Sequence, residues 1–333
     1  MRVFVSIPRD GDVFKTFLPP EVCKYMESVF EVKYLNGCEN LGAEEFCAAV
    51  RDFDAVITGW GHTQISYDML RDSRVRIIAH TGGSVGNLIG EGVYENGIRV
   101  MSGNILYAES VAEGTIAYML TGLRRIPYYI NEVRSGGWHG SGFFTEGLLD
   151  QTVGIIGLGT ISKILIKMLQ SYRVQLKIYS SHKIDGEFLK ENNAEQASLD
   201  EIFSGCKVVS LHSAMTEKTR GMIGKKHFDL LQRGALFVNT ARGDIVREDE
   251  MIAALKEKRF SAVLDVFSRE PLDEKSELRT LENVYCIPHM GGPTLDRRPY
   301  ITKRLAENIL KLENGGEAEL EIKGDAAKRM TKQ

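Results

Sequence analysis

Apolar residues recur along this chain in two alternating spacings. Short apolar runs such as Val3–Ile7 and Ala55–Thr58 alternate with segments whose apolar positions recur at helical intervals. This alternation predicts parallel sheets covered by helices on both faces, the α/β class. In the first 103 residues the expected strands are Val3–Ile7, Phe30–Leu35, Ala55–Thr58, Arg76–His80 and Ile98–Met101, and the expected helices include Glu21–Ser28 and Ala43–Arg51.

A long helical pattern follows at Ile105–Arg134, where apolar residues recur at helical spacing and the first proline is Pro127. The spacing is compatible with a helix that bridges two domains, with a dimer face, and with ordinary core packing. The pattern alone does not choose among them.

The second half opens on Thr152–Gly159, TVGIIGLG, a β-branched run that leads into a glycine-rich turn and then a helical pattern. Gly157 permits the tight turn, and Gly159 allows the backbone to approach a pyrophosphate at the helix N-terminus. Ser162 replaces the third glycine of the usual fingerprint and is still small. The segment therefore predicts dinucleotide binding, with a glycine-rich turn of any parallel sheet as the alternative.

The rest of this half continues the alternation. Residues Ser198–Glu201 form a capping box that should open a short helix. Helices are also expected around Asp249–Lys258 and over Thr294–Leu312. About six strands are expected here: one at the start of TVGIIGLG and the others at Val174–Tyr179, Val208–Leu211, Ala235–Asn239, Ala262–Val266 and Val284–Pro288.

Composition narrows the class of protein. At 333 residues the chain is long enough for two domains, and its net charge of −3 favours neither a nucleic-acid nor a membrane partner. The five cysteines form no CxxC pair, which argues against a disulfide framework and a zinc site and indicates a reducing compartment. No signal peptide and no apolar run near 18 residues is present, so we expect a cytoplasmic protein without a metal site.

Several loops that follow expected strands carry chemistry. Gly59–His62 and Thr81–Ser84 should lie at the carboxyl edge of the first sheet, where small residues can expose amides to an anion; both could also be simple turns. In the second half, Arg242, Glu270 and His289 each follow a strand, so they can meet at one edge. Arginine suits a carboxylate, and a histidine beside a glutamate suits proton transfer. Taken singly, each is as compatible with a solvated charge or a strand cap.

Five segments in order, VGIIGLGTIS, SLHSAMTEKTRGMIG, LFVNTARGDIV, LDVFSREPL and NVYCIPHMGG, resemble successive signatures of the D-isomer-specific 2-hydroxyacid dehydrogenase family. The match covers roughly residues 50–310, most of the chain. The resemblance implies hydride transfer between a nicotinamide and a small 2-oxo or 2-hydroxy acid of D configuration. It assigns His289 as acid/base, Glu270 as its partner, and Arg242 to the substrate carboxylate, with Gly82, Gly83 and Ser84 at the other side of that carboxylate.

The resemblance also implies a domain plan and a set of cofactor contacts. Residues 1–103 and 294–333 would form a flavodoxin-like substrate domain and 104–293 a Rossmann cofactor domain, with the cleft between them and a homodimer through the cofactor domain. Asp265 would meet the nicotinamide carboxamide. The full set of implied cofactor residues is Gly157, Gly159, Thr160, Ile161, Ser180, Ser181, His182, Lys183, Ala214, Thr219, Thr240, Ala241, Asp265 and Gly291.

Two departures from the family pattern bear on specificity. Ser180 stands where NAD-specific members carry an acidic residue, and Ser181, His182 and Lys183 follow it. Hydroxyls and a cation suit a 2′-phosphate, which favours NADP(H), whereas Asp185 keeps NAD(H) as the alternative. In the substrate loop, Gly86-Asn87 replaces the usual acidic residue, so the identity of the acid stays open.

Three readings compete within this resemblance. A glyoxylate or hydroxypyruvate reductase leads. A phosphoglycerate dehydrogenase would need further cations, and the loops at 59–63 and 81–87 offer only His62 and His80. A formate-dehydrogenase-like member is disfavoured because the Glu–His pair is retained. The non-enzyme alternative is a dinucleotide-sensing scaffold of the corepressor type.

Overall fold

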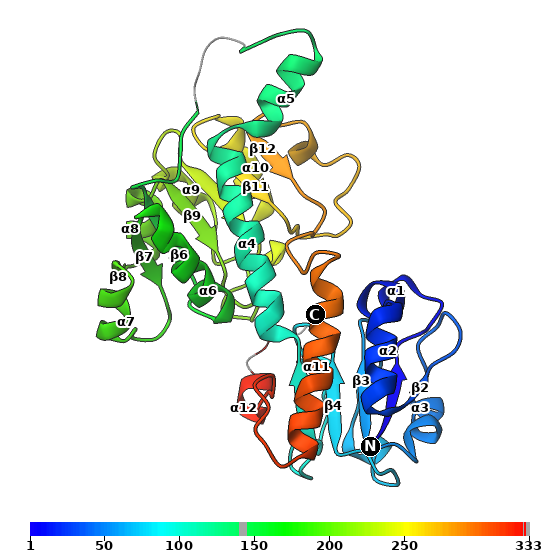
Figure 1. Cartoon of the computed structure of the whole chain (residues 1–333). Helices are drawn as coiled ribbons and strands as arrows, with labels where there is room; N and C mark the ends of the chain where they lie inside the picture. Colours follow the sequence, from blue (N-terminus) through cyan, green and yellow to red (C-terminus); the bar gives the residue numbers. More distant parts are fainter. Residues whose placement is uncertain (140–144, 329, 331–333) are drawn as a thin grey trace. The chain divides into compact units, whose positions relative to one another are not determined.

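The computed structural model describes residues 1–139, 145–328 and 330 and divides the chain into two compact units. Unit 1 comprises Met1–Ala108 and Pro293–Gln333, and unit 2 comprises Glu109–Gly292. Both are parallel α/β units, which confirms the predicted fold class (Figure 1). No helix in the described part of the chain combines the length and the hydropathy needed to cross a bilayer.

Unit 1 is built on a five-stranded parallel sheet in the order β2-β1-β3-β4-β5. Its central strands are buried throughout, as expected for a parallel sheet with helices on both faces. Helix α11, from the end of the chain, packs with α1 and α2 in this unit. The strands are β1 (Arg2–Ser6), β2 (Glu31–Tyr34), β3 (Ala55–Thr58), β4 (Ile77–His80) and β5 (Arg99–Ser102), and the helices are α1 (Asp12–Phe17), α2 (Pro20–Val29), α3 (Ala43–Val50), α11 (Arg297–Glu313) and α12 (Gly324–Ala327).

Unit 2 contains a seven-stranded parallel sheet in the order β12-β11-β10-β9-β6-β7-β8. The chain runs outward in both directions from β6, so the topological switch point lies between β6 and β9, where such sheets bind ligands. The strands are β6 (Thr152–Ile156), β7 (Gln175–Tyr179), β8 (Ala194–Gln196), β9 (Val208–Leu211), β10 (Leu236–Asn239), β11 (Ser261–Leu264) and β12 (Val284–Cys286).

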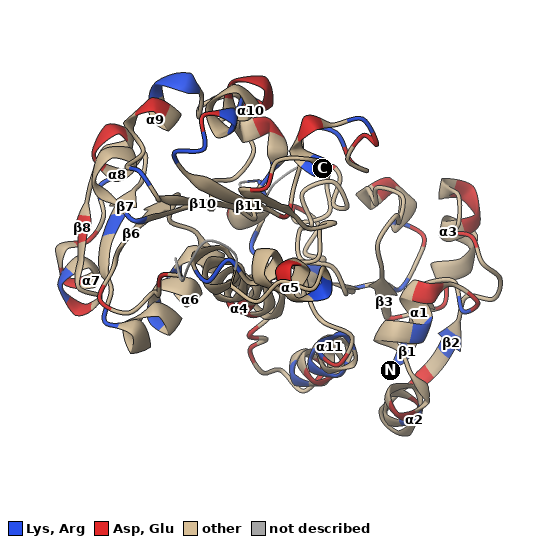
Figure 2. Ribbon diagram, turned by 90° about the horizontal axis from the view of Figure 1, so that it is seen from above, with Lys and Arg blue, Asp and Glu red and all other residues tan. Residues whose placement is uncertain are grey.

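Two layers of helices cover this sheet. One core cluster joins it to α8 (Leu199–Gly205), α9 (Lys225–Leu230) and α10 (Glu248–Lys256), and the other joins it to α4 (Asn104–Leu123) and α6 (Thr160–Leu169). Helix α7 (Gly186–Glu191) packs beside β8. Figure 2 shows the charged residues mainly on the outer helices and loops, with the central strands almost free of them.

Two sequence expectations for this part of the chain were wrong. Strand β8 was not predicted, because Ala194–Gln196 is a short edge strand without an apolar pattern. The helical segment 105–134 is two helices, since Arg125 adopts a left-handed conformation (φ 51°) between α4 and α5 (Ile126–Arg134). Pro127 lies in the first turn of α5, where its missing N–H has no consequence. The capping box at Ser198–Glu201 is confirmed at the start of α8.

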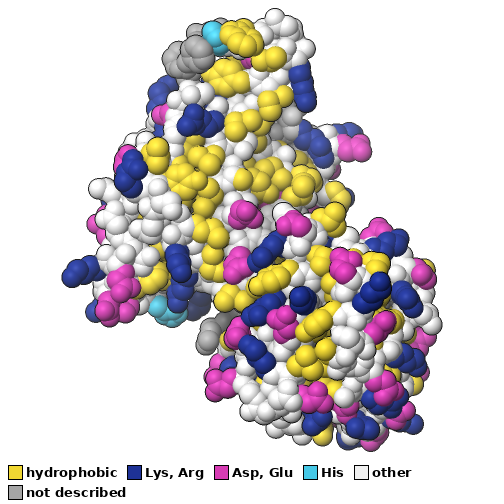
Figure 3. Space-filling model, viewed as in Figure 1, with side chains coloured by type: hydrophobic (Ala, Val, Ile, Leu, Met, Phe, Trp, Pro, Cys, Tyr) yellow, Lys and Arg dark blue, Asp and Glu magenta, His cyan; other side chains and the backbone are white. Residues whose placement is uncertain are grey.

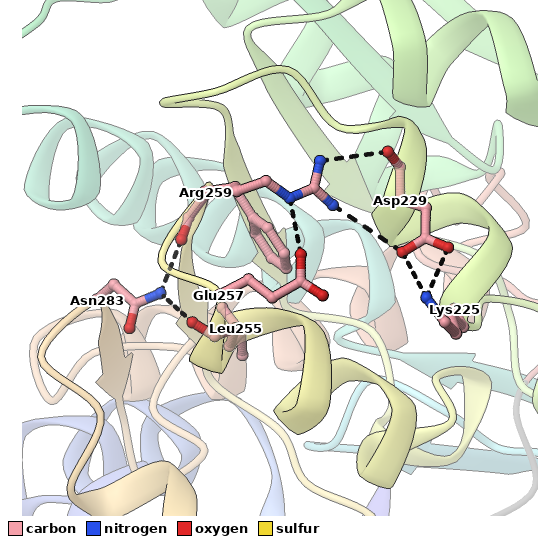
Figure 4. A network of polar contacts seen from close by, with 7 residues as sticks. Lys225, Asp229, Leu255, Glu257, Arg259 and Asn283 are labelled. Atoms are coloured by element: carbon pink, nitrogen blue, oxygen red, sulfur yellow. Dashed lines mark hydrogen bonds and ion pairs between the residues drawn. The ribbon is translucent and has the colours of Figure 1, made fainter.

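The amino ends of the strands in unit 2 are fixed by a polar network (Figure 4). Arg259, which precedes β11, pairs with Glu257 and Asp229, and Lys225 also pairs with Asp229. Asn283, which precedes β12, donates to the carbonyls of Leu255 (3.0 Å) and Phe260 (2.8 Å). These contacts leave the opposite edge of the sheet, at the carboxyl ends of the strands, to the candidate site.

Candidate active site

The glycine-rich turn after β6 has the geometry that a pyrophosphate requires. Gly157 has φ +99°, and a Cβ there would lie 2.7 Å from the Ser213 backbone, so only glycine fits. At Gly159 an added Cβ would meet no heavy atom of the described residues within 4 Å, which leaves open space over the start of α6. Ser162 Oγ donates to Gly157 O (2.5 Å), and this hydrogen bond stabilises the turn.

The residues of this turn therefore fit a dinucleotide. An α-helix leaves its first amides without intrahelical acceptors, and α6 starts with Thr160 and Ile161 directly after the open position. The N–H of Gly157 donates to the carbonyl of Tyr179 (2.9 Å), which ties this turn to the end of β7. The loop after β7 consequently begins beside the glycine-rich turn.

Residues 180–184 of that loop carry two hydroxyls and the ammonium group of Lys183, and no carboxylate. Ser180 Oγ accepts the N–H of His182 (3.2 Å), and the side chains of Ser181, His182 and Lys183 are exposed. Asp185, the alternative partner for a ribose, caps α7 instead and accepts the N–H of Glu187 (3.2 Å). The arrangement leaves the hydroxyl donors of a free ribose without a carboxylate acceptor at residues 180–184.

The remaining predicted cofactor residues line loops after β9 and β10. Thr219 Oγ donates to the carbonyl of Ala214 (2.7 Å) and staples this loop. The Thr240 hydroxyl is buried and lies 3.3 Å from Thr115 Oγ1 on α4, and the N–H of Ala241 donates to Asn239 Oδ1. Thr219 and Thr240 thus have structural contacts that hold the loops in place, and their contact with a cofactor stays a prediction.

Glu270 and His289 form a hydrogen-bonded pair at the ends of β11 and β12. His289 Nδ1 lies 2.6 Å from Glu270 Oε2, and Glu270 Oε1 accepts the N–H of Phe267 (3.0 Å). Both carboxylate oxygens are therefore occupied, which fixes the orientation of the acid. A carboxylate at Nδ1 favours a proton on that nitrogen and leaves Nε2 to exchange protons with a substrate.

The backbone of His289 is held in an unusual conformation. His289 has φ 51°, a left-handed geometry that a side chain rarely adopts, and its N–H donates to Asp265 O (3.0 Å). The Asp265 carboxylate is 2% exposed and accepts the N–H groups of Met290 (2.7 Å) and Gly291 (2.8 Å) and the hydroxyl of Tyr118 (3.3 Å). Asp265 therefore shapes the loop that presents His289, whatever else it binds.

Arg242 follows β10, the strand next to β11, and is half-buried. Its Nη1 donates to the carbonyl of Ala241 (2.7 Å), and it forms no ion pair with any residue that the structure describes. Burial lowers the pKa of Arg242, and the nearby Glu270 opposes that shift. Arginine stays protonated in proteins, so the remaining guanidinium donors of Arg242 suit an anion.

The predicted substrate loop, Gly82–Ser84, belongs to unit 1. An added Cβ at Gly82 would lie 2.3 Å from His80 Nε2, and one at Gly83 would lie 3.3 Å from the Tyr107 ring. His80 is buried, with Nδ1 2.9 Å from Thr58 Oγ1, and burial lowers its pKa to about 4. A side chain at Gly82 would therefore displace His80, and one at Gly83 would press on Tyr107. The role of these glycines toward a carboxylate stays a prediction.

His62, the other histidine considered in unit 1, also has structural contacts. Its Nε2 lies 2.9 Å from Ser6 Oγ, and its Nδ1 lies 2.8 Å from Thr63 O. Burial lowers its pKa, so it does not supply a cation near neutral pH.

Sequence reasoning missed two residues near these loops. Arg298 of α11 lies 5.4 Å from the Trp60 ring centroid and 5.7 Å from that of Phe17, and it donates to Thr16 Oγ1 and Pro293 O. It forms no ion pair within the described residues. Tyr118 was also missed, although it contacts Asp265. Neither residue belongs to a local sequence motif, because each lies on a helix that is distant in sequence from the loop it contacts.

Comparisons with known proteins agree with this geometry. Residues 116–291 match the model of the D-isomer specific 2-hydroxyacid dehydrogenase, NAD binding domain. A D-3-phosphoglycerate dehydrogenase from Methanocaldococcus jannaschii is 32% identical over 307 residues, 91% of this chain and 57% of that protein. The chain thus spans little more than half of that relative's length. The human glyoxylate reductase/hydroxypyruvate reductase is 31% identical over 245 residues, 72% of this chain and 74% of that protein.

A solved protein structure from Thermus thermophilus has a TM-score of 0.75 and 26% sequence identity to this chain, covering 97% of it and 100% of the other. The strand order of unit 2 is that of a doubly wound, dinucleotide-binding sheet. The chain belongs to the D-isomer specific 2-hydroxyacid dehydrogenase family. It is accordingly an oxidoreductase that acts on CH–OH donors with NAD(P) and interconverts small 2-hydroxy and 2-oxo acids.

Proposed function

We propose that this protein is an NADPH-dependent reductase of a small 2-oxo acid such as glyoxylate or hydroxypyruvate, and that it forms the D-2-hydroxy acid. The observation that carries the proposal is the 2.6 Å contact between His289 Nδ1 and Glu270 Oε2. Glu270 follows β11, the neighbour of the strand β10 that precedes Arg242, and His289 follows β12, the next strand along the sheet. A proton donor, its orienting carboxylate and a carboxylate-binding cation are the groups that this reduction needs.

In this proposal each residue has one task. Arg242 binds the substrate carboxylate through a planar pair of N–H donors, which also orients the adjacent carbonyl. His289 Nε2 donates a proton to the carbonyl oxygen as negative charge develops there, and Glu270 stabilises the imidazolium form and the tautomer. In the oxidative direction His289 accepts the proton from the hydroxyl. Gly83 and Ser84 are assigned to a substrate carboxylate on the family resemblance alone.

The dinucleotide is held by the residues that the family resemblance implies. Gly157, Gly159, Thr160 and Ile161 bind the pyrophosphate, and Asp265 binds the carboxamide through the acceptor capacity left on its Oδ2. When bound, the nicotinamide supplies or receives the hydride at C2 of the acid. Ser180, Ser181, His182 and Lys183 take the 2′-phosphate, an assignment supported by the capping role of Asp185.

A phosphoglycerate dehydrogenase is the second candidate, and Arg298 is the observation that favours it. This arginine supplies, beside the loop after β3, the further cation that such a substrate would require. The protein from Methanocaldococcus jannaschii with that name is among the relatives, although the chain spans only 57% of it.

One assay separates these candidates: oxidation of NADPH and of NADH with glyoxylate, hydroxypyruvate, 3-phosphohydroxypyruvate, pyruvate and bulkier 2-oxo acids. We expect turnover with glyoxylate or hydroxypyruvate and a lower KM for NADPH. A preference for 3-phosphohydroxypyruvate that is lost in Arg298→Met supports the second candidate. Tight cofactor binding without turnover of any acid contradicts both and favours the sensing scaffold.

The protein is proposed to act as a homodimer through α4 and α5 of unit 2. Ile126, Ile130 and Val133 lie on one stripe of α5, spaced by four and three residues, and are 43%, 44% and 51% exposed. Figure 3 shows apolar side chains gathered over this part of the unit. A second copy would cover the stripe. Ile130→Asp is expected to convert a dimer to a monomer in light scattering, and a monomeric wild type contradicts the proposal.

The cytoplasm is the proposed location. All five cysteines are free thiols, as is usual for proteins of a reducing compartment.

A further inference from the structure

The loop between β7 and α7 is braced from outside by one side chain. Gln196, the last residue of β8, accepts the N–H of Ile184 through Oε1 (3.0 Å). Its Nε2 donates to the carbonyl of His182 (2.9 Å) and, in a longer contact, to that of Ser180 (3.5 Å). The amide orientation follows from chemistry, because the reverse assignment would place an NH₂ group against the Ile184 N–H.

The rest of the loop is fixed at both ends. Tyr179, which precedes it, accepts the N–H of Gly157, and Ile184, which ends it, is 6% exposed and packs into the core beneath α6. Between these anchors, the Ser180 Oγ accepts the N–H of His182. The Gln196 side chain contacts the beginning, middle and end of the loop. Its amide therefore fixes the loop backbone, and with it the positions of the side chains that the loop carries.

From these contacts we infer that Gln196 is a positioning residue for the 2′-phosphate of NADPH. It touches neither the phosphate nor the reacting atoms; it holds Ser180–Lys183 in the conformation that receives the phosphate. The inference rests on the proposed preference for NADPH. Without the Gln196 hydrogen bonds, the loop must become ordered when the cofactor binds, and this ordering lowers the binding free energy. NADPH, which contacts the loop through its 2′-phosphate, loses affinity, whereas binding of the nicotinamide end is unaffected.

Gln196→Met tests this by removing the hydrogen bonds at nearly constant size. We expect the KM for NADPH to rise about five- to tenfold, with kcat at saturating NADPH and the KM for NADH within about twofold of wild type. Calorimetry without turnover provides an independent readout. Adenosine 2′,5′-bisphosphate should lose affinity by the same factor, and 5′-AMP should not.

Two further variants make the test specific. Glu195→Gln, on the same strand, removes the partner of Lys177 (3.0 Å) and leaves the brace intact, so its cofactor selectivity should equal that of wild type. Gln196→Leu removes the same hydrogen bonds without adding a charge, so it should also lower the NADPH/NADH selectivity. This variant decides the question if Gln196→Met does not fold.

The outcomes are distinct. In one outcome the wild type prefers NADPH, but the Gln196 variants change the KM values for NADPH and NADH equally or not at all. This result overturns the role of Gln196 and leaves the proposed cofactor preference intact. A wild type that prefers NADH overturns the role of Gln196 and the proposed cofactor preference together, and leaves the reaction class intact. Loss of the NADPH preference at unchanged kcat supports the inference.

Discussion

Gly243 lies against the backbone of Phe267 so closely that a Cβ at Gly243 would be 1.9 Å from the Phe267 carbonyl carbon. The loop that begins with Arg242 and the loop that leads to Glu270 are therefore packed backbone to backbone. The residue proposed to bind the carboxylate and the residue proposed to orient the proton donor are held in register by a backbone contact that only glycine permits.

Gly243→Ala is expected to disrupt this register. The atoms met by the new methyl group belong to the backbone of Phe267 and Ser268, which cannot yield cheaply. We expect kcat/KM to fall by about 100-fold or more and the unfolding temperature to drop. Gly186→Ala is the control, since its Cβ meets no described atom within 4 Å; equal activity of the two variants would contradict the prediction.

His289→Gln is expected to lower kcat by about 10³-fold while the Kd for the dinucleotide changes less than about twofold, because a proton donor is lost and not a binding contact. Glu270→Gln keeps an oxygen acceptor for His289 Nδ1 and removes the charge, so its loss should be smaller. Stopped-flow kinetics and cofactor fluorescence provide the two readouts. Near-normal turnover of His289→Gln would exclude it as the acid/base.

The burial of His80 leads us to expect that the stability of unit 1 depends on pH. Burial lowers its pKa from 6.5 to about 4, so above pH 6.5 it is neutral in both the folded and unfolded states. As the pH falls from 6.5 to about 4, only the unfolded state takes up the proton, and the free energy of unfolding falls by about 3 kcal/mol. Below about pH 4 the folded state also protonates and this contribution becomes constant.

Urea unfolding at several pH values, followed by Trp60 fluorescence in a Trp138→Phe background, measures this dependence. In His80→Gln the slope between pH 6.5 and 4 should decrease, although stability at pH 8 also falls through lost packing. His62, whose pKa is lowered by burial as well, contributes a remainder of the same sign. An unchanged slope in His80→Gln would contradict the assignment.

Asn283→Ala is expected to destabilise unit 2 without changing its chemistry. It leaves the carbonyls of Leu255 and Phe260 without their donor, at a cost of about 1–3 kcal/mol. Because Asn283 precedes β12 and His289 follows it, kcat should remain within about twofold. Glu257→Gln in the same network affects an exposed ion pair and should change stability by less than about 1 kcal/mol. A large kcat loss in Asn283→Ala would contradict this separation.

The sequence was sufficient for the elements that bury a continuous apolar run. Strands such as Val208–Leu211 and Ala55–Thr58 are observed with the predicted bounds, because a parallel strand covered on both faces must be apolar throughout. Strand β8 could not be predicted from the sequence because it is an exposed edge strand without an apolar pattern. It is stabilised by hydrogen bonds to β7. The division of the long helix at Arg125 was not predicted because it depends on the left-handed backbone conformation of that residue and not on a sequence pattern.

The candidate site divides in the same way. Arg242, Glu270 and His289 each follow a strand and belong to a recognisable motif, so their proximity was predictable from topology. The left-handed backbone of His289, the grip of Asp265 on the 290–291 amides, and the position of Arg298 depend on packing between distant segments. Local spacing carries no trace of such contacts.

His289, the proposed acid/base, lies just beyond β12, a three-residue strand at the edge of the sheet and the last strand of unit 2 in the chain. During synthesis, every other strand of the unit leaves the ribosome before His289 does. The part of the sheet from β6 to β11 can thus assemble on a nascent chain that does not yet contain His289. In the proposed mechanism, this unit gains its proton donor last.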